Sequence, residues 1–436
     1  MKLPSAKELL AVAGEACRQA LEAPLYSAGI NLFRLGVKLA GQGNGKAAKL
    51  NRGQSEIWSR IEEKIRPGDR VVWVHAASLG EFEQGRTLIE KLKRERPEFK
   101  ILLTFFSPSG YEVRKNYEGA DCICYLPFDT PSRVRRFIEM VRPEVAVFVK
   151  YEIWRNYLHQ LYEHSIPTYL MSAVFRPEQH FFKPGSWYGL WLKWYTRIFV
   201  QDERSRTLLA GIGVTEVDVT GDTRFDRVAE IRVQHRRLPE LERFTRHGRP
   251  DAPLVMMAGS SWPADEDVYA EWFDRHPDVK LVIAPHEFNE SRLAALKRRF
   301  ANGVVLLSEM KSDPAAAEKC QVLVIDCFGM LSSAYALCDV AYVGGGFGAG
   351  LHNINEAAVY GIPVIYGPNN KKFIEAQELA ENGGGCPVSN RAEFEAVATE
   401  LFDNRTERER RGKCAAAYIQ SKTGATEKIY KSIFKS

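Results

Sequence analysis

The sequence predicts an α/β protein built from two domains, each with a doubly wound parallel sheet, and a cleft between them. The chain has 436 residues, which suits two domains of about 200 residues each better than one. From residue 70 onward, short apolar runs alternate with helical stretches, a pattern typical of a parallel sheet with helices on both faces. The alternation stops at the highly charged, apolar-poor residues 229–250 and then restarts.

The apolar runs place the expected strands. The first half has them at residues 71–75, 101–105, 123–126, 145–149, 168–172, 198–201 and 217–220, and the second half at residues 254–258, 280–284, 304–307, 322–325, 340–343 and 363–366. We therefore expect an N-terminal segment at 1–60, a first domain at 61–228, a linker at 229–250, and a second domain with a C-terminal helix at 251–436.

Composition narrows the function classes. Hydrophobic residues make up 45% and charged residues 26%, which excludes wholesale disorder, and a net charge of +5 is too mild for a nucleic-acid binder. Eight cysteines without a C-x-x-C pair, and no H-E-x-x-H, argue against a disulfide scaffold and a zinc site and favour a reduced cytoplasmic setting. No run of 18 apolar residues occurs, so no membrane-spanning helix is expected.

The positive charge is concentrated at the N-terminus. Residues 1–60 contain nine basic and four acidic residues, a net of +5, so the remaining residues sum to zero. Residues 25–40 read as a helix with a narrow polar stripe (Ser27, Asn31, Arg34, Lys38) and a wide apolar face. This pattern suits a helix that lies in the membrane interface, although a helix packed on its own domain with a solvated stripe would look the same.

An aromatic cluster follows in the first half. Residues 181–199 contain basic but no acidic side chains, together with Phe181, Phe182, Trp187, Tyr188, Trp191, Trp194, Tyr195 and Phe199. Some of these rings must be core, while a cluster with only positive charges also suits contact with an anionic lipid.

Because ligands in doubly wound sheets bind outside the carboxyl ends of the strands, the residues after each strand are the candidates for chemistry. The strand at 71–75 runs into small residues, including Ser78 and Gly80, that leave room for a ligand. Glu81 follows at the opening of the next helix and would serve as a base toward a hydroxyl. The alternative is a carboxylate at a helix N-terminus that has only an electrostatic effect there.

Two further charged residues follow strands of the first half. Glu152 comes after the strand at 145–149, where it would act on the ligand or simply pair with Lys150 or Arg155. Arg224 comes after the strand at 217–220 and places a cation at the same edge.

The second half offers neutral groups at its strand ends. Gly259, Ser260 and Ser261 form an expected anion cradle at a helix N-terminus. A glycine loop at 344–350 precedes a helix starting near Asn353, with Glu356 in its first turn. No G-x-G-x-x-G register fits this loop, and no P-loop motif occurs. We expect instead that the flexible loop makes room for a phosphate and that Glu356 accepts hydrogen bonds from ribose hydroxyls.

In chain order, these elements resemble a known family. They are the small residues with Glu81, Glu152-Ile153-Trp154, residues 221–226, Gly259-Ser260-Ser261, and a Gly-x-x-Asn-x-x-Glu-Ala-Ala run followed by Gly361-Ile362-Pro363. Over roughly residues 25–425 the chain resembles the 3-deoxy-D-manno-octulosonic acid (Kdo) transferases of lipid A biosynthesis. The resemblance implies a GT-B glycosyltransferase fold, with two Rossmann-like domains facing across a cleft.

The resemblance also implies a reaction. CMP-Kdo would donate Kdo, with inversion and without metal or cofactor, to a lipid A precursor (lipid IVA) in lipopolysaccharide core synthesis. The enzyme would be peripheral at the cytoplasmic face of the inner membrane, attached by residues 1–60, with the acceptor in domain 61–228 near Ser78 and Gly80 and the donor in domain 251–436. No nucleic-acid partner is expected.

The family's functional positions carry over residue by residue. Glu81 matches the general base, and Glu152 and Arg224 match residues that steady the transition state. The donor positions, with Ser261 added from the anion cradle, are Ser260, Ser261, Pro285, His286, Phe328, Gly329, Met330, Asn353, Ile354, Asn355 and Glu356. Two positions depart from the family: Arg224 replaces a lysine, and Pro285 is followed directly by His286 where the family has Pro-Arg-His.

Two other hypotheses remain. One is a different GT-B enzyme that uses a UDP-sugar in cell-envelope glycan synthesis, which should be protected from unfolding by UDP and not by CMP. The other is a two-domain binding protein that performs no chemistry.

Overall fold

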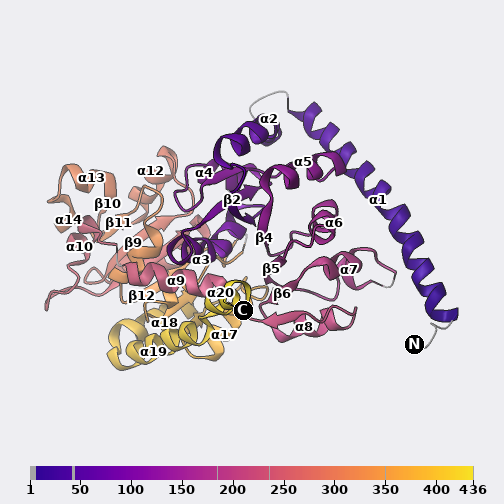
Figure 1. Ribbon diagram of the computed structural model, residues 1–436. Helices are drawn as coiled ribbons and strands as arrows, with labels where there is room; N and C mark the ends of the chain where they lie inside the picture. Colours follow the sequence, from indigo (N-terminus) through magenta and orange to yellow (C-terminus); the bar gives the residue numbers. More distant parts are fainter. Residues whose placement is uncertain (1–5, 42–44, 184, 235, 349, 436) are drawn as a thin grey trace. The chain divides into compact units, whose positions relative to one another are not determined.

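The computed structural model describes residues 6–41, 45–183, 185–234, 236–348 and 350–435, with the backbone alone at 6–21 and 316 (Figure 1). It divides into two compact units. Unit 1 comprises the residues up to Arg227 together with those from Gly424, and unit 2 comprises Val228–Thr423. Each unit is described by itself.

Unit 1 contains a seven-stranded parallel sheet in the order β3-β2-β1-β4-β5-β6-β7. The strands are β1 Arg70–His75, β2 Phe99–Phe105, β3 Cys122–Tyr125, β4 Pro143–Val149, β5 Thr168–Ala173, β6 Arg197–Val200 and β7 Val217–Val219. Almost every residue of β1 and β2 is buried, which is the pattern of strands covered by helices on both faces.

The helices of unit 1 alternate with these strands. They are α1 Ala6–Ala40, α2 Lys46–Lys64, α3 Leu79–Glu95, α4 Pro108–Arg114, α5 Pro131–Val141, α6 Arg155–Glu163, η1 His180–Phe182, α7 Tyr188–Trp191, η2 Leu192–Trp194, α8 Glu203–Ala210 and α20 Ala425–Phe434. The long helix α9 Thr223–Gln234 contains the point at which unit 1 ends.

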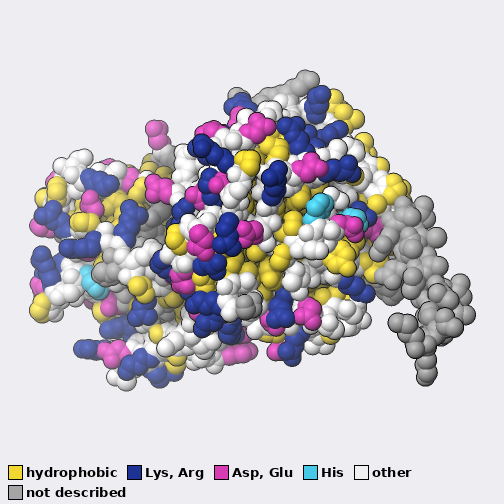
Figure 2. All heavy atoms as spheres, viewed as in Figure 1, with side chains coloured by type: hydrophobic (Ala, Val, Ile, Leu, Met, Phe, Trp, Pro, Cys, Tyr) yellow, Lys and Arg dark blue, Asp and Glu magenta, His cyan; other side chains and the backbone are white. Residues whose placement is uncertain are grey.

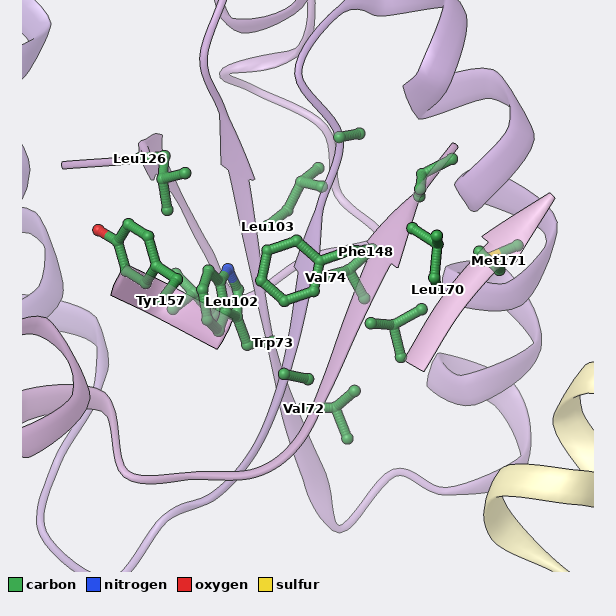
Figure 3. Close-up of a cluster of buried hydrophobic side chains, with 14 of the residues drawn as sticks. Val72, Trp73, Val74, Leu102, Leu103, Leu126, Phe148, Tyr157, Leu170 and Met171 are labelled. Carbon is green, nitrogen blue, oxygen red and sulfur yellow. The ribbon is translucent and has the colours of Figure 1, made fainter. Parts of the chain in front are cut away.

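The core of unit 1 is built on the central strands (Figure 3). The fully buried Trp73 of β1 packs edge-on against Phe148 of β4, at 5.0 Å between ring centroids, and against Tyr157 of α6 at 5.4 Å. Such large aromatic contacts fix β1 and β4 relative to each other. The loops at the ends of these two strands are therefore held by a rigid base.

Unit 2 repeats the architecture with the strand order β10-β11-β9-β8-β12-β13-β14. Its strands are β8 Val255–Ser261, β9 Lys280–Pro285, β10 Val304–Leu306, β11 Val322–Val324, β12 Val340–Val343, β13 Val364–Tyr366 and β14 Gly385–Pro387. Its helices are α10 Pro239–Thr245, α11 Pro263–Arg275, α12 Glu290–Arg299, α13 Leu307–Ser312, α14 Ala316–Lys319, α15 Leu331–Ala334, η3 Tyr335–Leu337, α16 Asn355–Ala358, α17 Ile374–Glu381, α18 Arg391–Asp403 and α19 Arg405–Lys422.

The expected fold class, α/β with two Rossmann-like domains of the GT-B type, is confirmed, and each strand named from the sequence is present within a few residues. Strand β14 was not expected, because the run Gly383-Gly384-Gly385-Cys386-Pro387 has turn composition and a single apolar side chain. Residues 229–250 also differ from the expected linker, since they contain the end of α9 and all of α10 and belong to unit 2.

The C-terminal helix α20 belongs to unit 1, whereas the sequence placed it in the second domain. Ile429, Tyr430 and Ile433 are buried in the core of unit 1. Asp226 accepts hydrogen bonds from the backbone N–H of Gly424 and Thr426, at 2.5 and 2.6 Å, and so caps the start of the helix. Burial and this cap explain why the chain returns to unit 1 at its end.

One side of α1 packs on unit 1. The buried carboxylate of Glu22 accepts a hydrogen bond from Trp191 Nε1 and pairs with Arg155 at 3.5 Å, while Tyr26 OH donates to Asp129 at 2.7 Å. Burial of Asp129 raises its pKa to about 6. These contacts anchor the helix to its own domain through buried polar groups.

The opposite side of α1 faces away from the core. Leu25, Leu32, Leu35 and Leu39 are 61, 72, 51 and 65% exposed, and the basic Arg34 and Lys38 are exposed beside them. Figure 2 shows these hydrophobic and basic side chains along the described part of the helix, at upper right. The helix thus packs on its own domain with one face, as one of the two hypotheses expected. Its other face stays apolar and exposed, as the hypothesis of an interfacial helix requires.

Candidate functional site

The candidate residues gather at the carboxyl edge of each sheet, by which we mean the edge formed by the carboxyl ends of its strands. The strand order reverses between β1 and β4 in unit 1 and between β8 and β12 in unit 2. In doubly wound sheets such reversals leave a crevice for ligands. The segments after β1, β4 and β12 contain Glu81, Glu152 and the glycine loop at 344–350, and Ser260 lies near the end of β8.

Glu81 is the third residue of α3, and its side chain is half-buried. Its Oε2 accepts hydrogen bonds from the backbone N–H of Ser78 at 2.7 Å and from Ser78 Oγ at 2.5 Å. This is the capping arrangement that fixes a carboxylate at a helix N-terminus. Both bonds use one oxygen, which leaves Oε1 for a ligand. Gly80 is exposed directly beside it.

Glu152 lies at the end of a buried chain of hydrogen bonds. Its Oε2 accepts from Trp154 Nε1 at 2.6 Å and lies 3.1 Å from His75 Nε2. His75 Nδ1 is 2.9 Å from Thr104 Oγ1, which is 2.8 Å from Trp73 Nε1. The alternative partners named from the sequence, Lys150 and Arg155, are absent from the hydrogen bonds of the carboxylate in the described part of the chain.

The direction of one bond in this chain is fixed by its donor. An indole N–H can only donate, so Trp73 donates to the Thr104 hydroxyl. His75 Nδ1 lies 2.9 Å from that hydroxyl and 3.1 Å from the backbone oxygen of Thr104, and its Nε2 lies 3.1 Å from Glu152 Oε2. The network holds Glu152 as a buried acceptor in one orientation.

Arg224 is held at the same edge by Asp222. Its Nε donates to Asp222 Oδ2 at 2.7 Å and its backbone N–H to Oδ1 at 2.9 Å. Gln84 of α3, one turn after Glu81, donates to the same carboxylate at 3.4 Å. Thr223 Oγ1 donates to the backbone oxygen of Gln84 at 2.7 Å. The loop with Arg224 is therefore tied to the helix that carries Glu81.

Two non-glycine residues at these edges have left-handed backbone. Lys150, directly after β4, has φ 73°, and Ser260, in β8, has φ 51°. Such strained residues persist where the surroundings enforce them and occur often at functional sites. Their positions after β4 and within β8 coincide with the two strand-order reversals.

In unit 2, Asp265 fixes the glycine loop. This buried carboxylate accepts hydrogen bonds from the backbone N–H of Gly345 and of Trp262, each at 2.9 Å, and from Tyr342 OH at 2.9 Å. A Cβ added at Gly344 would lie 2.3 Å from Ser260 O. The loop after β12 and the loop after β8 are thus packed backbone to backbone.

A second close approach explains another glycine pair. A Cβ on Gly346 would lie 2.6 Å from Gly367, and a Cβ on Gly367 would lie 2.6 Å from Gly346. By contrast, a Cβ on Gly348 would have its nearest neighbour at 4.0 Å. The loop therefore needs glycine at 346 for packing. Its N–H groups at Gly344, Gly345, Gly348 and Gly350 are bonded within the protein, to Gly259 O, to Asp265 and, for the last two, to Gly345 O.

Three stacked rings lie beside this loop. His286 stacks on Trp262 at 4.4 Å and on His352 at 4.5 Å, and Trp262 Nε1 donates to His352 Nε2 at 3.2 Å. Burial and the neighbouring His286 lower the pKa of His352. The hydrogen bond agrees with this direction, because a ring nitrogen that accepts belongs to a neutral imidazole.

The remaining donor candidates differ in their surroundings. Ser261 is buried, with its hydroxyl 2.8 Å from Tyr269 OH. Glu356 accepts hydrogen bonds from Ser332 and, at 3.2 Å, from Asn353. Phe328 is 83% exposed.

Asn355 stands out among the other candidates, which are Pro285 at the end of β9, Gly329, the buried Met330 and the buried Ile354. It is fully buried, and neither its Oδ1 nor its Nδ2 has a hydrogen-bond partner among the residues that the structure describes. Such a group is expected to gain partners from a ligand or water.

Among the described residues, no group of three or more His, Cys, Asp and Glu side chains is arranged to hold a metal ion. No helix there is both long and apolar enough to cross a membrane.

Comparison with known proteins bears on both halves of the chain. A family model described as 3-deoxy-D-manno-octulosonic-acid transferase (kdotransferase) matches residues 52–227. The 3-deoxy-D-manno-octulosonic acid transferase of Haemophilus influenzae is 25% identical over 377 residues, covering 83% of this chain and 86% of the relative. That of Aquifex aeolicus is 27% identical over 367 residues, covering 81% and 93%. The chain is a relative of the Kdo transferases.

The resemblance expected from the motifs is therefore confirmed. A solved structure of UDP-GlcNAc 2-epimerase from Neisseria meningitidis bound to UDP-GlcNAc also aligns, with a TM-score of 0.59, 15% identity, and coverage of 84% of this chain and all of that one. At this identity the likeness concerns the fold alone.

The structure adds residues that sequence reasoning did not single out. His75 and Thr104 support Glu152, Asp265 holds the glycine loop, and Trp262 stacks on His286. A histidine closing an otherwise apolar strand was the available signal for His75, and the acidic helix start after Pro263 was the signal for Asp265. Neither signal names a partner, because the partners come from distant segments.

Proposed function

We propose that the chain is an inverting glycosyltransferase that moves Kdo from CMP-Kdo to a lipid A precursor, lipid IVA, in lipopolysaccharide core synthesis. The observation that carries this proposal is the similarity to Kdo transferases along most of the chain, together with Glu81 at the carboxyl edge of unit 1. Unit 1 would bind the acceptor and unit 2 the donor.

Glu81 is the proposed general base. Its Oε2 is engaged by Ser78, so Oε1 would take the proton of the acceptor hydroxyl. The hydroxyl oxygen then forms a bond to the anomeric carbon of Kdo as the bond from that carbon to the CMP phosphate oxygen breaks. CMP leaves with that electron pair, and the small residues around Ser78 and Gly80 would admit the acceptor sugar.

Glu152 and Arg224 would steady the charges of the transition state. The positive charge that develops on the Kdo ring would be met by Glu152, whose orientation His75 and Trp154 fix. The negative charge that develops on the leaving phosphate would be met by Arg224, held by Asp222. An arginine in place of the family's lysine keeps the charge but changes the donor geometry.

The carboxyl edge of unit 2 would bind CMP. The backbone N–H groups of Gly346 and Phe347 in the glycine loop would donate to the phosphate, Ser260 and Asn353 offer polar side chains, and Glu356 would accept from ribose hydroxyls. The unpartnered amide of Asn355 would gain partners from the nucleotide or a bridging water. Trp262, His286 and His352 provide a ring stack where the family has an arginine.

The exposed face of α1 supports a peripheral position at the cytoplasmic face of the inner membrane. Its leucines would enter the interface while Arg34 and Lys38 contact anionic headgroups, at about 1 kcal/mol for each charge. The acceptor, being acylated and phosphorylated, resides at the same surface.

Mass spectrometry of the lipid product tests the proposal. The purified chain with CMP-Kdo and lipid IVA should add one or more Kdo units, and with a UDP-sugar in place of CMP-Kdo it should add nothing. A UDP-sugar product would instead favour the alternative GT-B glycosyltransferase. No product from either donor would favour a binding protein.

A further inference from the structure

An apolar cavity lies between α1 and the aromatic segment around α7. It measures about 330 Å³ and is lined by Leu25, Tyr26, Gly29, Ile30, Trp187, Tyr188 and Trp191. Trp191 contacts Tyr26 edge-on at 5.2 Å and Tyr188 in a tilted arrangement at 4.7 Å between ring centroids, which makes a wall of packed rings. Two segments that the sequence linked only by composition therefore form one cavity.

The walls of this cavity offer little to a polar ligand. The hydroxyl of Tyr26 is already bonded to Asp129, and the indole N–H of Trp191 is already bonded to Glu22. Trp187 and Tyr188 each add one polar atom to a lining that is otherwise hydrocarbon and ring surface. A mostly apolar lining of this kind favours a hydrocarbon ligand.

The cavity also continues the exposed face of α1. Leu25 lines the cavity and is one of the four exposed leucines of the helix, beside the basic Arg34 and Lys38. A surface of this kind matches a lipid interface rather than the polar rim of a protein partner.

A short series of contacts joins the cavity to the proposed catalytic residues. Glu152 is bonded to Trp154, the residue directly before α6. The next residue, Arg155, pairs with Glu22, which is bonded to Trp191 in the cavity wall. The cavity wall and the proposed catalytic residues are therefore connected within one domain, at the end of β4 and the start of α6.

We propose that this cavity binds one fatty-acyl chain of the acceptor lipid and so selects acylated acceptors. This inference rests on the proposed function, because it names a subsite for the same acceptor. Binding the chain here would orient the acceptor as well as raise its affinity, since an anchored chain limits the positions open to the sugar.

Gly29 allows a clean test. A Cβ at this position meets nothing within 4 Å, so Gly29→Leu would fill part of the cavity without a clash. Gly36 on the same helix also has nothing within 4 Å and does not line the cavity. Gly36→Leu is the matched control, because it makes the same change in helix propensity and in apolar surface.

Initial rates would be measured in detergent micelles with lipid IVA and with its deacylated sugar backbone. For Gly29→Leu we expect the KM for lipid IVA to rise about tenfold, which corresponds to losing the burial of roughly two methylene groups. The KM for the deacylated acceptor and both values for Gly36→Leu should match those of the unsubstituted chain.

Three outcomes would overturn the proposal. Gly29→Leu could leave the KM for lipid IVA unchanged, or raise the KM for both acceptors equally, which would indicate a structural effect. Equal changes in Gly29→Leu and Gly36→Leu would assign the effect to the helix surface and the bulk lipid.

A second measurement separates this inference from the proposed function. Quenching of tryptophan fluorescence by a lipid brominated on its acyl chain requires no transfer activity. Gly29→Leu should be quenched less than Gly36→Leu if the cavity holds a chain, even if no Kdo is transferred. Equal quenching in the two variants would show that the cavity does not bind an acyl chain, whether or not Kdo is transferred.

Discussion

The carboxyl edges of the two sheets share a topology but differ in chemistry. In unit 1 the edge is built from ionisable side chains, with Glu81, Glu152 and Arg224 each held by a named partner. In unit 2 it is built from backbone and neutral rings, with Gly344 to Gly346 packed against neighbouring backbone and His286 within a ring stack. Under the proposed function, this difference assigns proton transfer and charge stabilisation to unit 1 and binding of the CMP anion to unit 2.

Glu81→Gln is expected to have the largest effect. The amide keeps the shape of the side chain but cannot accept the proton, so kcat should fall by about 10²–10⁴. Initial rates with CMP-Kdo and lipid IVA would measure this. Glu83→Gln makes the same change two residues later on the same helix and is the matched control. Full activity of the Glu81→Gln variant would show that Glu81 is not the general base.

Gly346→Ala tests the other edge. Its Cβ would lie 2.6 Å from Gly367, so the loop must shift, and we expect the affinity for CMP to fall about tenfold or more. Gly348→Ala changes the same loop, with its nearest neighbour at 4.0 Å, and should bind CMP normally. Calorimetric titration compares the two. Equal affinities would show that the loop does not shape the donor site.

Thr104→Val sharpens the account of the unit 1 edge. The substitution keeps the shape but removes the hydroxyl that contacts both Trp73 Nε1 and His75 Nδ1, so the His75 ring would hold Glu152 less firmly in its orientation. We expect kcat to fall about tenfold with KM unchanged, and Thr104→Ser to restore the rate because it keeps the hydroxyl. A fall in kcat that Thr104→Ser does not restore would point to packing alone.

The smallest expected effect concerns pH and His352. Its pKa is lowered in the folded chain, so below the ordinary histidine pKa the unfolded chain binds more protons. Stability should therefore fall as the pH is lowered from about 7 toward 5. The unfolding temperature of His352→Gln should fall about 2 °C less over this range. If the unfolding temperature falls equally in His352→Gln and in the unsubstituted chain, His352 does not cause the loss of stability.

The strands other than β14 were predictable because each is a short apolar run between turn residues, as at Val71–Val74. The assignment of α20 to unit 1 was not, since it depends on the cap from Asp226 and on packing against distant residues. The same holds within the sites. Glu81 could be found from its place after a strand, but the support of Glu152 by His75 and Thr104 joins two strands that only the folded sheet brings together.

The division between the two edges is tested most directly by calorimetric titration of CMP into Glu81→Gln. The account predicts the same dissociation constant as for the unsubstituted chain, although this variant should transfer almost no Kdo, because Glu81 serves the acceptor on unit 1 and CMP is bound by unit 2. A dissociation constant raised tenfold or more would contradict it and would place Glu81 in nucleotide binding.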